Sequence, residues 1–316
     1  MSIEEQVTLY EVGLRDGLQN EPAFVPTDDK LVLARMLADA GLTRIELTSF
    51  VSPRWIPQLA DHERVAHDAE RRPGVQYSAL VPNRRGLDGA RRAHLDEVAI
   101  FLSATETHTQ RNINKSISEA LAVLSEVSAC AIAAGIRVRG YISVVFGCPY
   151  EGAVATARVH ALVRSLLDMG VFEVSLGDTI GVGNPRQVKN LVRSLLTEVS
   201  PDRLALHLHD TRGTALANVV SGLDEGIRTF DTSFGGLGGC PYAPGAAGNL
   251  ATEDLVYLLD GMGCPCSVDL DRLILASLHV TELIGRSLPS KVLQAELARR
   301  QRDLSRRAKA NQTTST

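Results

Sequence analysis

The chain has 316 residues, with 33 Lys and Arg against 37 Asp and Glu, and a formal net charge of −4. This charge gives no electrostatic reason to expect nucleic acid or an anionic membrane surface as the main partner, and 44% hydrophobic residues exclude a disordered chain. The length allows one large barrel or two smaller domains. Only 4% of the residues are aromatic, so we expect a core of mainly Leu, Val, Ile and Ala, as in parallel sheets covered by helices.

Short β-branched runs alternate with helical stretches along the chain. The runs predict eight strands, at residues 7–12, 43–48, 75–80, 98–103, 138–146, 172–176, 204–208 and 229–234. Helical spacing of apolar residues predicts intervening helices, including 28–40, 116–134, 153–169, 185–199 and 214–225. Thr27 and Ser116 are the expected hydroxyl caps of two helices, and Gly41, Gly135 and Gly170 stand where helix ends favour a positive φ.

Eight strand–helix units of about 30 residues each predict an α/β fold, a single (β/α)₈ TIM barrel over residues 1–295. A doubly wound open sheet is the alternative, but it should carry a dinucleotide-binding glycine fingerprint after an early strand, and the sequence has none. Residues 296–316 are basic and polar, and we expect a C-terminal helical extension that frays into a partly disordered tail.

The sequence gives no targeting or redox signal. No window approaches the roughly 18 consecutive apolar residues of a membrane span, and the first residues resemble neither a secretory signal nor a transit sequence, so we expect a cytoplasmic protein without membrane contacts. The five cysteines form no CxxC pair, which argues against a disulfide framework and against a zinc ribbon.

Polar residues gather at the expected carboxyl ends of the strands, where a barrel places its active site. Two histidines, His207 and His209, are separated by one residue on a strand, so they point to the same face, towards the barrel mouth. Such a pair can share a divalent ion, whereas a lone buried histidine is more often a core residue. Asp16, after the first strand, and Asn249, after the eighth, are candidate oxygen ligands, although Asp16 could equally cap a helix or pair with Arg15. Mixed nitrogen and oxygen ligands with open positions favour octahedral Mg²⁺ or Mn²⁺.

A glycine-rich segment follows the eighth expected strand. Residues 235–249 hold six glycines and two prolines around Cys240, a composition that can hinge over a ligand. The Cys240 thiol is therefore our candidate acid or base, against the alternative of a small buried hydrophobe. Cys148, in a second copy of the Gly-Cys-Pro-Tyr motif, is left undecided, and we expect the remaining three cysteines to be structural: Cys130, Cys264 and Cys266.

Seven motifs spread over nearly the whole chain resemble 3-hydroxy-3-methylglutaryl-CoA lyases, a family of metal-dependent TIM-barrel enzymes. The loop around Cys240 is similar to the catalytic-cysteine signature of that family. The motifs stand at residues 11–21, 48–53, 112–114, 147–152, 176–181, 236–242 and 248–254.

The resemblance implies a lyase of leucine degradation that cleaves an acyl-CoA with a tertiary 3-hydroxyl into acetyl-CoA and acetoacetate. It implies that Mg²⁺ or Mn²⁺ is held by four residues: Asp16, His207, His209 and Asn249. Arg15 would neutralise the developing enolate, Cys240 and Asp178 would move protons, and Glu46 would orient Arg15 or assist proton transfer. Gln19, Asn112 and Asn114 are expected substrate contacts together with Arg15, and a homodimer is a further expectation from the family.

The sequence departs from the family at the expected rim of the site. Arg212 stands where the family usually has Tyr, Pro22 where it often has Lys, and residues 285–287 differ from a stretch that helps to hold the CoA nucleotide. These departures motivate an alternative, a lyase of a longer or branched 3-hydroxy-3-carboxymethyl acyl-CoA. A condensing transferase that joins acetyl-CoA to a 2-oxoacid is a further alternative from the same barrel group.

Overall fold

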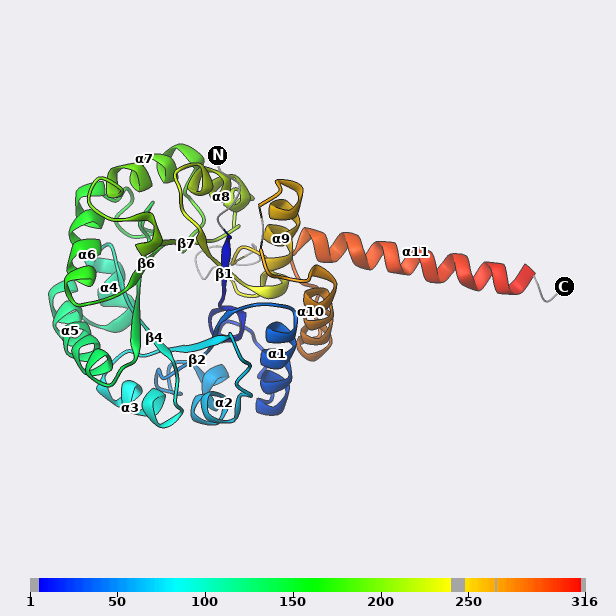
Figure 1. Cartoon of the computed structure of the whole chain (residues 1–316), viewed down its shortest axis with the longest axis horizontal. Coiled ribbons are helices and arrows are strands. Elements are labelled where there is room, and N and C mark those ends of the chain that lie inside the picture. Colours follow the sequence, from blue (N-terminus) through cyan, green and yellow to red (C-terminus); the bar gives the residue numbers. More distant parts are fainter. Residues whose placement is uncertain (1–5, 240–247, 265, 314–316) are drawn as a thin grey trace.

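A computed structural model of the chain describes residues 6–239, 248–264 and 266–313, and side chains as far as Asp303. In this part of the chain eight parallel strands close into a barrel in the order β1 to β8, ringed by helices (Figure 1). The predicted TIM barrel is therefore confirmed. The strands are β1 (Thr8–Glu11), β2 (Arg44–Ser49), β3 (Gln76–Leu80), β4 (Glu97–Ser103), β5 (Arg137–Ser143), β6 (Glu173–Asp178), β7 (Leu204–Leu208) and β8 (Thr229–Thr232).

The helices follow the strands in alternation, as the apolar spacing predicts. The α-helices are α1 (Thr27–Asp39), α2 (His62–Asp68), α3 (Arg84–Arg92), α4 (Glu106–Ile113), α5 (Ile117–Ala133), α6 (Thr156–Asp168), α7 (Pro185–Leu195), α8 (Ala215–Asp224), α9 (Thr252–Gly261), α10 (Leu270–Ile284) and α11 (Lys291–Thr313). Four shorter helices are the π-helix η1 (Gly13–Gly17) and the 3₁₀ turns η2 (Pro57–Leu59), η3 (Pro201–Arg203) and η4 (Phe234–Gly236).

The caps predicted from the sequence are confirmed except at α1. Ser116 forms a capping box with Glu119 at the start of α5. Gly41, Gly135 and Gly170 have φ angles of 95°, 76° and 85°, as expected. Thr27 is not a cap: α1 has Pro26 at its N-cap, and the Thr27 hydroxyl donates instead to Asp61 of the β2–α2 loop at 2.8 Å.

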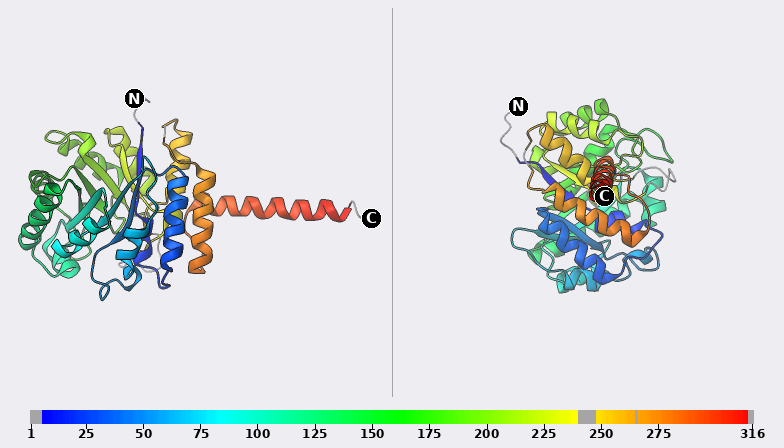
Figure 2. Two further views of the ribbon diagram at one scale, coloured as in Figure 1. Left: turned by 60° about the horizontal axis from the view of Figure 1, so that its bottom comes forward. Right: turned by 90° about the vertical axis from the view of Figure 1, so that its right-hand side faces the viewer.

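Helix α11 extends away from the barrel (Figures 1 and 2). It runs without a break through the boundary expected at residues 295 and 296. No single helix in the described ranges is long and apolar enough to cross a membrane. Among the described helices, α4 and α5 taken together have the length and apolar composition of a membrane span, but the pair is bent by 59°. Both helices pack on β4.

The apolar core lies between the strands and the helices rather than inside the barrel. It is built mainly from Leu, Val, Ile and Ala, as composition predicts. The barrel interior holds instead one small apolar cluster, Leu80, Ala99 and Tyr141, among many polar side chains. The composition did not indicate that the barrel interior is polar; there, inward-facing strand positions carry charges that pair with one another.

Buried ion pairs fill the barrel interior near the amino ends of the strands. Arg139, with 0% exposure, donates through Nε to Glu173 at 2.6 Å and through Nη2 to Asp231 at 2.7 Å. Arg44 donates to Glu173 at 3.0 Å. The Tyr10 ring is packed against both guanidiniums, 4.0 Å and 4.6 Å from their central carbons. Arg44, Arg139 and their carboxylate partners thus each have an opposite charge within hydrogen-bonding distance. Such pairing is the condition under which charges can be kept out of water.

Candidate active site

A cavity of about 880 Å³ opens at the carboxyl ends of the strands. Residues from β3 to β7 and from the loops after β1 and β2 line it, so the usual functional end of a TIM barrel is hollowed here. Gly239 of the glycine-rich segment lines it. The predicted site residues that line it are Arg15, Asp16, Gln19, Asn112, Asn114, His207 and His209.

A single π-helical turn directly after β1 places Arg15 and Asp16 side by side at the cavity. The backbone N–H groups of Asp16 and Gly17 both donate to the carbonyl of Val12, at 2.7 Å and 3.2 Å. Gly17 lets this turn approach the loop after β8 closely, since a Cβ there would lie 2.8 Å from Cβ of Leu237. π-helical turns are rare and often occur at functional sites.

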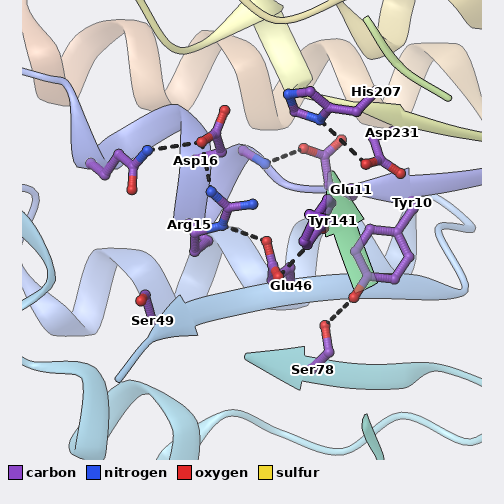
Figure 3. Close-up of polar contacts among 12 residues, drawn as sticks. Tyr10, Glu11, Arg15, Asp16, Glu46, Ser49, Ser78, Tyr141, His207 and Asp231 are labelled. Atoms are coloured by element: carbon purple, nitrogen blue, oxygen red, sulfur yellow. Dashed lines mark hydrogen bonds and ion pairs between the residues drawn. The ribbon is translucent and has the colours of Figure 1, made fainter. Parts of the chain in front are cut away.

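The Arg15 guanidinium lies between two carboxylates (Figure 3). Its Nε donates to Glu46 at 2.5 Å and its Nη1 donates to Asp16 at 2.6 Å. Burial alone would lower the pKa of Arg15, but the two carboxylates outweigh burial and raise it, so the group keeps its charge. Glu46 thus contacts Arg15 directly, and its role, to orient Arg15 or to assist proton transfer, stays a prediction.

Asp16, His207 and His209 form a group able to hold a metal ion, because one ligand atom of each lies within 4.8 Å of the others. The two Nε2 atoms of the histidines lie 3.1 Å apart. Two ligands at right angles around one ion, each about 2.1 Å from it, would also lie about 3 Å apart. The predicted metal-binding side chains therefore converge as a divalent cation requires.

Protonation states in this group also suit a cation. Burial and the neighbouring His207 lower the pKa of His209 to about 3, so its imidazole is neutral near pH 7. Burial would raise the pKa of Asp16, but Arg15 and the two histidines lower it overall, so the carboxylate is ionised. Neutral imidazole and ionised carboxylate are the forms that bind metals.

Asn249 reaches the same group from the segment after β8. Its backbone bridges to His209, and its Nδ2 donates to Asp16 at 2.7 Å and to the Leu237 carbonyl at 3.1 Å. Its buried Oδ1 accepts no hydrogen bond from the described residues. A cation beside Asp16 is the kind of partner this oxygen lacks, and the role of Asn249 as a fourth ligand stays a prediction.

Asp231 is a polar neighbour of this group that the sequence analysis missed. Strand register pairs Asp231 of β8 with His207 of β7, and Oδ2 of Asp231 lies 3.3 Å from Nδ1 of His207 (Figure 3). Burial would raise the pKa of Asp231, but Arg139 and His207 lower it well below its usual range. The sequence does contain a signal for Asp231, an acidic residue in the middle of a strand. Because side chains alternate along β8, Asp231 points into the barrel when Phe230 points outward.

Asp178 is placed differently from the expectation. It is not among the described residues that line the cavity, although Gly177 and Thr179 on either side of it are. Its carboxylate accepts the backbone N–H groups of Val182 and Gly183, at 3.0 Å and 2.8 Å, and so shapes the β6–α7 loop. Burial raises its pKa. Its role in proton transfer stays a prediction.

Of the two cysteines in the Gly-Cys-Pro-Tyr motifs, Cys148 lies in the described part of the chain. Cys240 lies outside the described residues. Cys148 is buried, and its Sγ accepts hydrogen bonds from the Thr105 hydroxyl at 3.1 Å and from the Tyr150 backbone at 3.4 Å. Cys148 does not line the cavity, among the residues that the structure describes.

Two of the three departures at the rim, Arg212 and residues 285–287, have defined contacts or conformations in the structure. Arg212 donates to the carbonyls of Ile180 and Gly181, at 2.8 Å and 3.0 Å, and is not among the described cavity residues. Gly285 ends α10 with a φ of 69°, which favours glycine. Arg286 makes a bidentate ion pair with Glu21.

Two fully buried glutamates hold the turn that leads into the glycine-rich loop. Glu11 accepts the backbone N–H groups of Gly13 and Phe234, at 2.8 Å and 3.0 Å, and the Thr252 hydroxyl at 2.6 Å. Glu253 accepts the N–H of Gly235 at 2.8 Å. Burial raises the pKa of Glu11 to about 8 and that of Glu253 to about 7. These contacts connect η1, which carries Arg15, to the start of the segment that carries Cys240.

Comparison with known proteins places this site in a family. A family model described as HMGL-like matches residues 6–280. The hydroxymethylglutaryl-CoA lyase of Bacillus subtilis is 50% identical over 93% of this chain and 98% of its own length. The mitochondrial hydroxymethylglutaryl-CoA lyase of Bos taurus is 50% identical over 92% of this chain and 90% of its own.

Solved structures agree with the sequence match. The HMG-CoA lyase of Bacillus subtilis superposes with a TM-score of 0.92 over 93% of this chain and 99% of its own. An HMG-CoA lyase of Acinetobacter baumannii, solved in complex with coenzyme A and 3-methylmalate, is 41% identical and superposes with a TM-score of 0.88 over 92% of this chain and 95% of its own. With these matches over most of its length, the chain belongs to the HMGL-like family.

Proposed function

We propose that this protein is a 3-hydroxy-3-methylglutaryl-CoA lyase, which releases acetyl-CoA and acetoacetate and serves leucine degradation. The observation that carries the proposal is the convergence of Asp16, His207 and His209 beside the buried Arg15 at one cavity. Relatives that are 50% identical over most of this chain carry that activity in their names. A relative with bound coenzyme A supports an acyl-CoA substrate.

The proposed reaction is a retro-Claisen cleavage. The tertiary hydroxyl at C3 of the substrate gives its proton to a base of the site, the role that we propose for the Asp178 carboxylate, the C2–C3 bond breaks, and its electron pair moves onto the thioester as an enolate. C3 becomes the ketone carbon of acetoacetate, and C2 takes a proton to give acetyl-CoA. Mg²⁺ or Mn²⁺ held by Asp16, His207, His209 and Asn249 would supply a Lewis acid that makes the hydroxyl more acidic.

The chain's own groups would then handle charge and protons. Arg15 faces the cavity with a fixed positive charge, suited to the negative charge that develops on the thioester oxygen. Glu46 holds the guanidinium in place from the buried side. We assign delivery of the proton to C2 to Cys240, because Gly239 lines the cavity immediately before it. Gln19, Asn112 and Asn114 would contact the substrate from the rim.

No observation favours the alternative acyl-CoA substrates. The longer-tail alternative was motivated chiefly by Arg212, whose guanidinium is engaged by backbone carbonyls of the β6–α7 loop. The condensing-transferase alternative predicts condensation of acetyl-CoA with a 2-oxoacid, and detection of that product would favour it. Comparison of kcat/KM across short and extended 3-hydroxy-3-carboxymethyl thioesters decides between tails, and we expect the short methyl substrate to be preferred.

The test is to incubate purified protein with 3-hydroxy-3-methylglutaryl-CoA and Mg²⁺ or Mn²⁺, with and without a chelator, and to identify products by mass spectrometry. We expect stoichiometric acetyl-CoA and acetoacetate, loss of both with chelator, and recovery when the metal is restored. Absence of cleavage by folded protein that binds Mn²⁺ would refute the proposed substrate. Turnover that persists after complete metal removal would refute the proposed cofactor.

Assembly and location complete the proposal. We propose a cytoplasmic homodimer; curated relatives include forms named cytoplasmic and forms named mitochondrial. Sedimentation equilibrium would give the mass of the assembly, and a monomer at assay concentration would refute the dimer. Fractionation of the source cells with an antibody against the protein tests its location.

A further inference from the structure

Asp231 and Arg139 lie in the barrel interior, on the side of His207 that faces away from the cavity. They have no part in the proposed reaction. His207 presents Nε2 to His209 at 3.1 Å on the cavity side and Nδ1 to Asp231 at 3.3 Å on the buried side. The imidazole is therefore fixed between the candidate metal position and a buried carboxylate. A carboxylate at Nδ1 favours the tautomer whose proton is on Nδ1, which leaves the Nε2 electron pair for a metal.

Asp231 is itself held on several sides. Arg139 donates to Oδ1 at 2.7 Å and to Oδ2 at 3.3 Å, and the Ser175 hydroxyl donates to Oδ2 at 2.8 Å. Arg139 is held in turn by Glu173, so the carboxylate of Asp231 cannot rotate without breaking buried charged contacts. Both Asp231 and Arg139 have side-chain exposures of 0%.

The two histidines differ in what lies behind the ring. Nδ1 is buried in both and makes no hydrogen bond of ideal geometry with a described residue, but among those residues Nδ1 of His207 has a carboxylate at ion-pair distance, Oδ2 of Asp231 at 3.3 Å, and Nδ1 of His209 has none. The two imidazoles of the His-x-His pair are therefore unequal: one is oriented from behind by a carboxylate, and the other is fixed by its backbone and packing. A role that is specific to His207 can be tested against this difference.

We infer that Asp231, held by Arg139, is a positioning residue that fixes the ring orientation and tautomer of His207 for metal binding. This inference rests on the metal site proposed above. Loss of an outer carboxylate behind a ligating histidine typically weakens metal affinity about 10- to 100-fold. We expect a weakening of that size in Asp231→Asn, with metal occupancy and turnover recovered at raised Mn²⁺ concentration.

The experiment measures the Kd for Mn²⁺ from the electron paramagnetic resonance signal of free Mn²⁺, in full-length native protein and in Asp231→Asn. Glu97→Gln is the matched control, because Glu97 is also a buried interior carboxylate beside an arginine, 3.4 Å from Arg44, but lies away from the histidines. We expect Glu97→Gln to keep the native Kd even if it lowers the melting temperature. An equal weakening in both variants would show a general effect on stability and overturn the inference.

A second measurement needs no metal. Long-range ¹⁵N–¹H NMR of metal-free protein labelled at histidine reports which ring nitrogen carries the proton. We expect the Nδ1–H form at His207 in the native protein and a shift towards the Nε2–H form in Asp231→Asn, with His209 unchanged. An unchanged His207 tautomer would overturn the inference.

A folding failure of Asp231→Asn would not end the test. The paired variant Arg139→Met with Asp231→Asn removes both charges together, a change that buried pairs tolerate better than removal of one partner. We expect the same loss of Mn²⁺ affinity in this variant, and a native Kd would refute the inference. Native protein that fails to bind Mn²⁺ would instead refute the proposed metal site, so the two failures are distinguishable.

Discussion

Replacement of Arg15 separates two contributions of one side chain, its charge and its branched shape. The guanidinium donates to Glu46 through Nε and to Asp16 through Nη1, and both contacts are largely buried. Arg15→Lys keeps the charge, but one ammonium cannot make both contacts in this geometry. A lost hydrogen bond to a charged group is worth about 2 kcal/mol. At 1.36 kcal/mol per tenfold change, kcat should fall about 30-fold.

Arg15→Met removes the charge as well as the shape. Removal of one group that stabilises a developing oxyanion costs about 10²- to 10³-fold in kcat, and the loss of both buried contacts adds to this. We therefore expect Arg15→Met to be at least tenfold slower than Arg15→Lys. Initial rates of acetyl-CoA release at saturating Mn²⁺ measure the difference, with circular dichroism as a check on folding. Equal rates for the two variants would refute the role of the charge.

Three further predictions test the cysteines, the buried glutamate and the rim. Cys240→Ser should keep the native Mn²⁺ affinity but lose most turnover, whereas Cys148→Ser should change kcat less than threefold; the reverse ranking would show that the wrong copy of the motif was chosen. Burial raises the pKa of Glu253 from 4.5 in the unfolded chain to about 7 in the folded protein. Between these two values the folded protein holds a proton on Glu253 that the unfolded chain has lost. The free energy of unfolding contributed by this group therefore falls as pH rises from about 5 through 7. The melting temperature of Glu253→Gln should therefore fall less over that range than that of the native protein, and parallel curves would contradict the assignment. Arg212→Tyr should lower the melting temperature without changing the preference for acyl tail length, and a new preference for longer tails would place residue 212 at the substrate.

The fold and the convergence of the two candidate metal-binding histidines could be predicted because both depend on local periodicity. Alternation along β7 places His207 and His209 on one face whatever the neighbouring strands do. The register between β7 and β8, which brings Asp231 beside His207, depends on how two strands slide past each other. No local pattern fixes that quantity, so Asp231 remained outside the predicted site.

Backbone conformation limited the prediction in other places. Arg15 and Asp16 lie on a π-helical turn, which differs from an α-helical turn by one residue and leaves no distinct periodicity in a segment of five. Asp178 follows the pattern of a strand-end catalytic acid, yet its carboxylate accepts two backbone N–H groups of its own loop. Arg212 suggested a substrate contact from the sequence because its hydrogen bonds to carbonyls of the β6–α7 loop depend on the fold of that loop.

Because β1 pairs with β8, the candidate site cannot form until most of the chain has been synthesised. Asp16 and Asn249 are separated by 233 residues, and Glu11 meets Thr252 across 241. A ribosome that adds 5–20 residues per second needs roughly 10 to 50 seconds to reach that point. During this interval β1 has one unpaired edge, and the nascent chain carries Arg15 and Asp16 without their partners from the other end. Prematurely terminated chains therefore lack an assembled site, and the exposed edge of β1 marks them for chaperones and proteases.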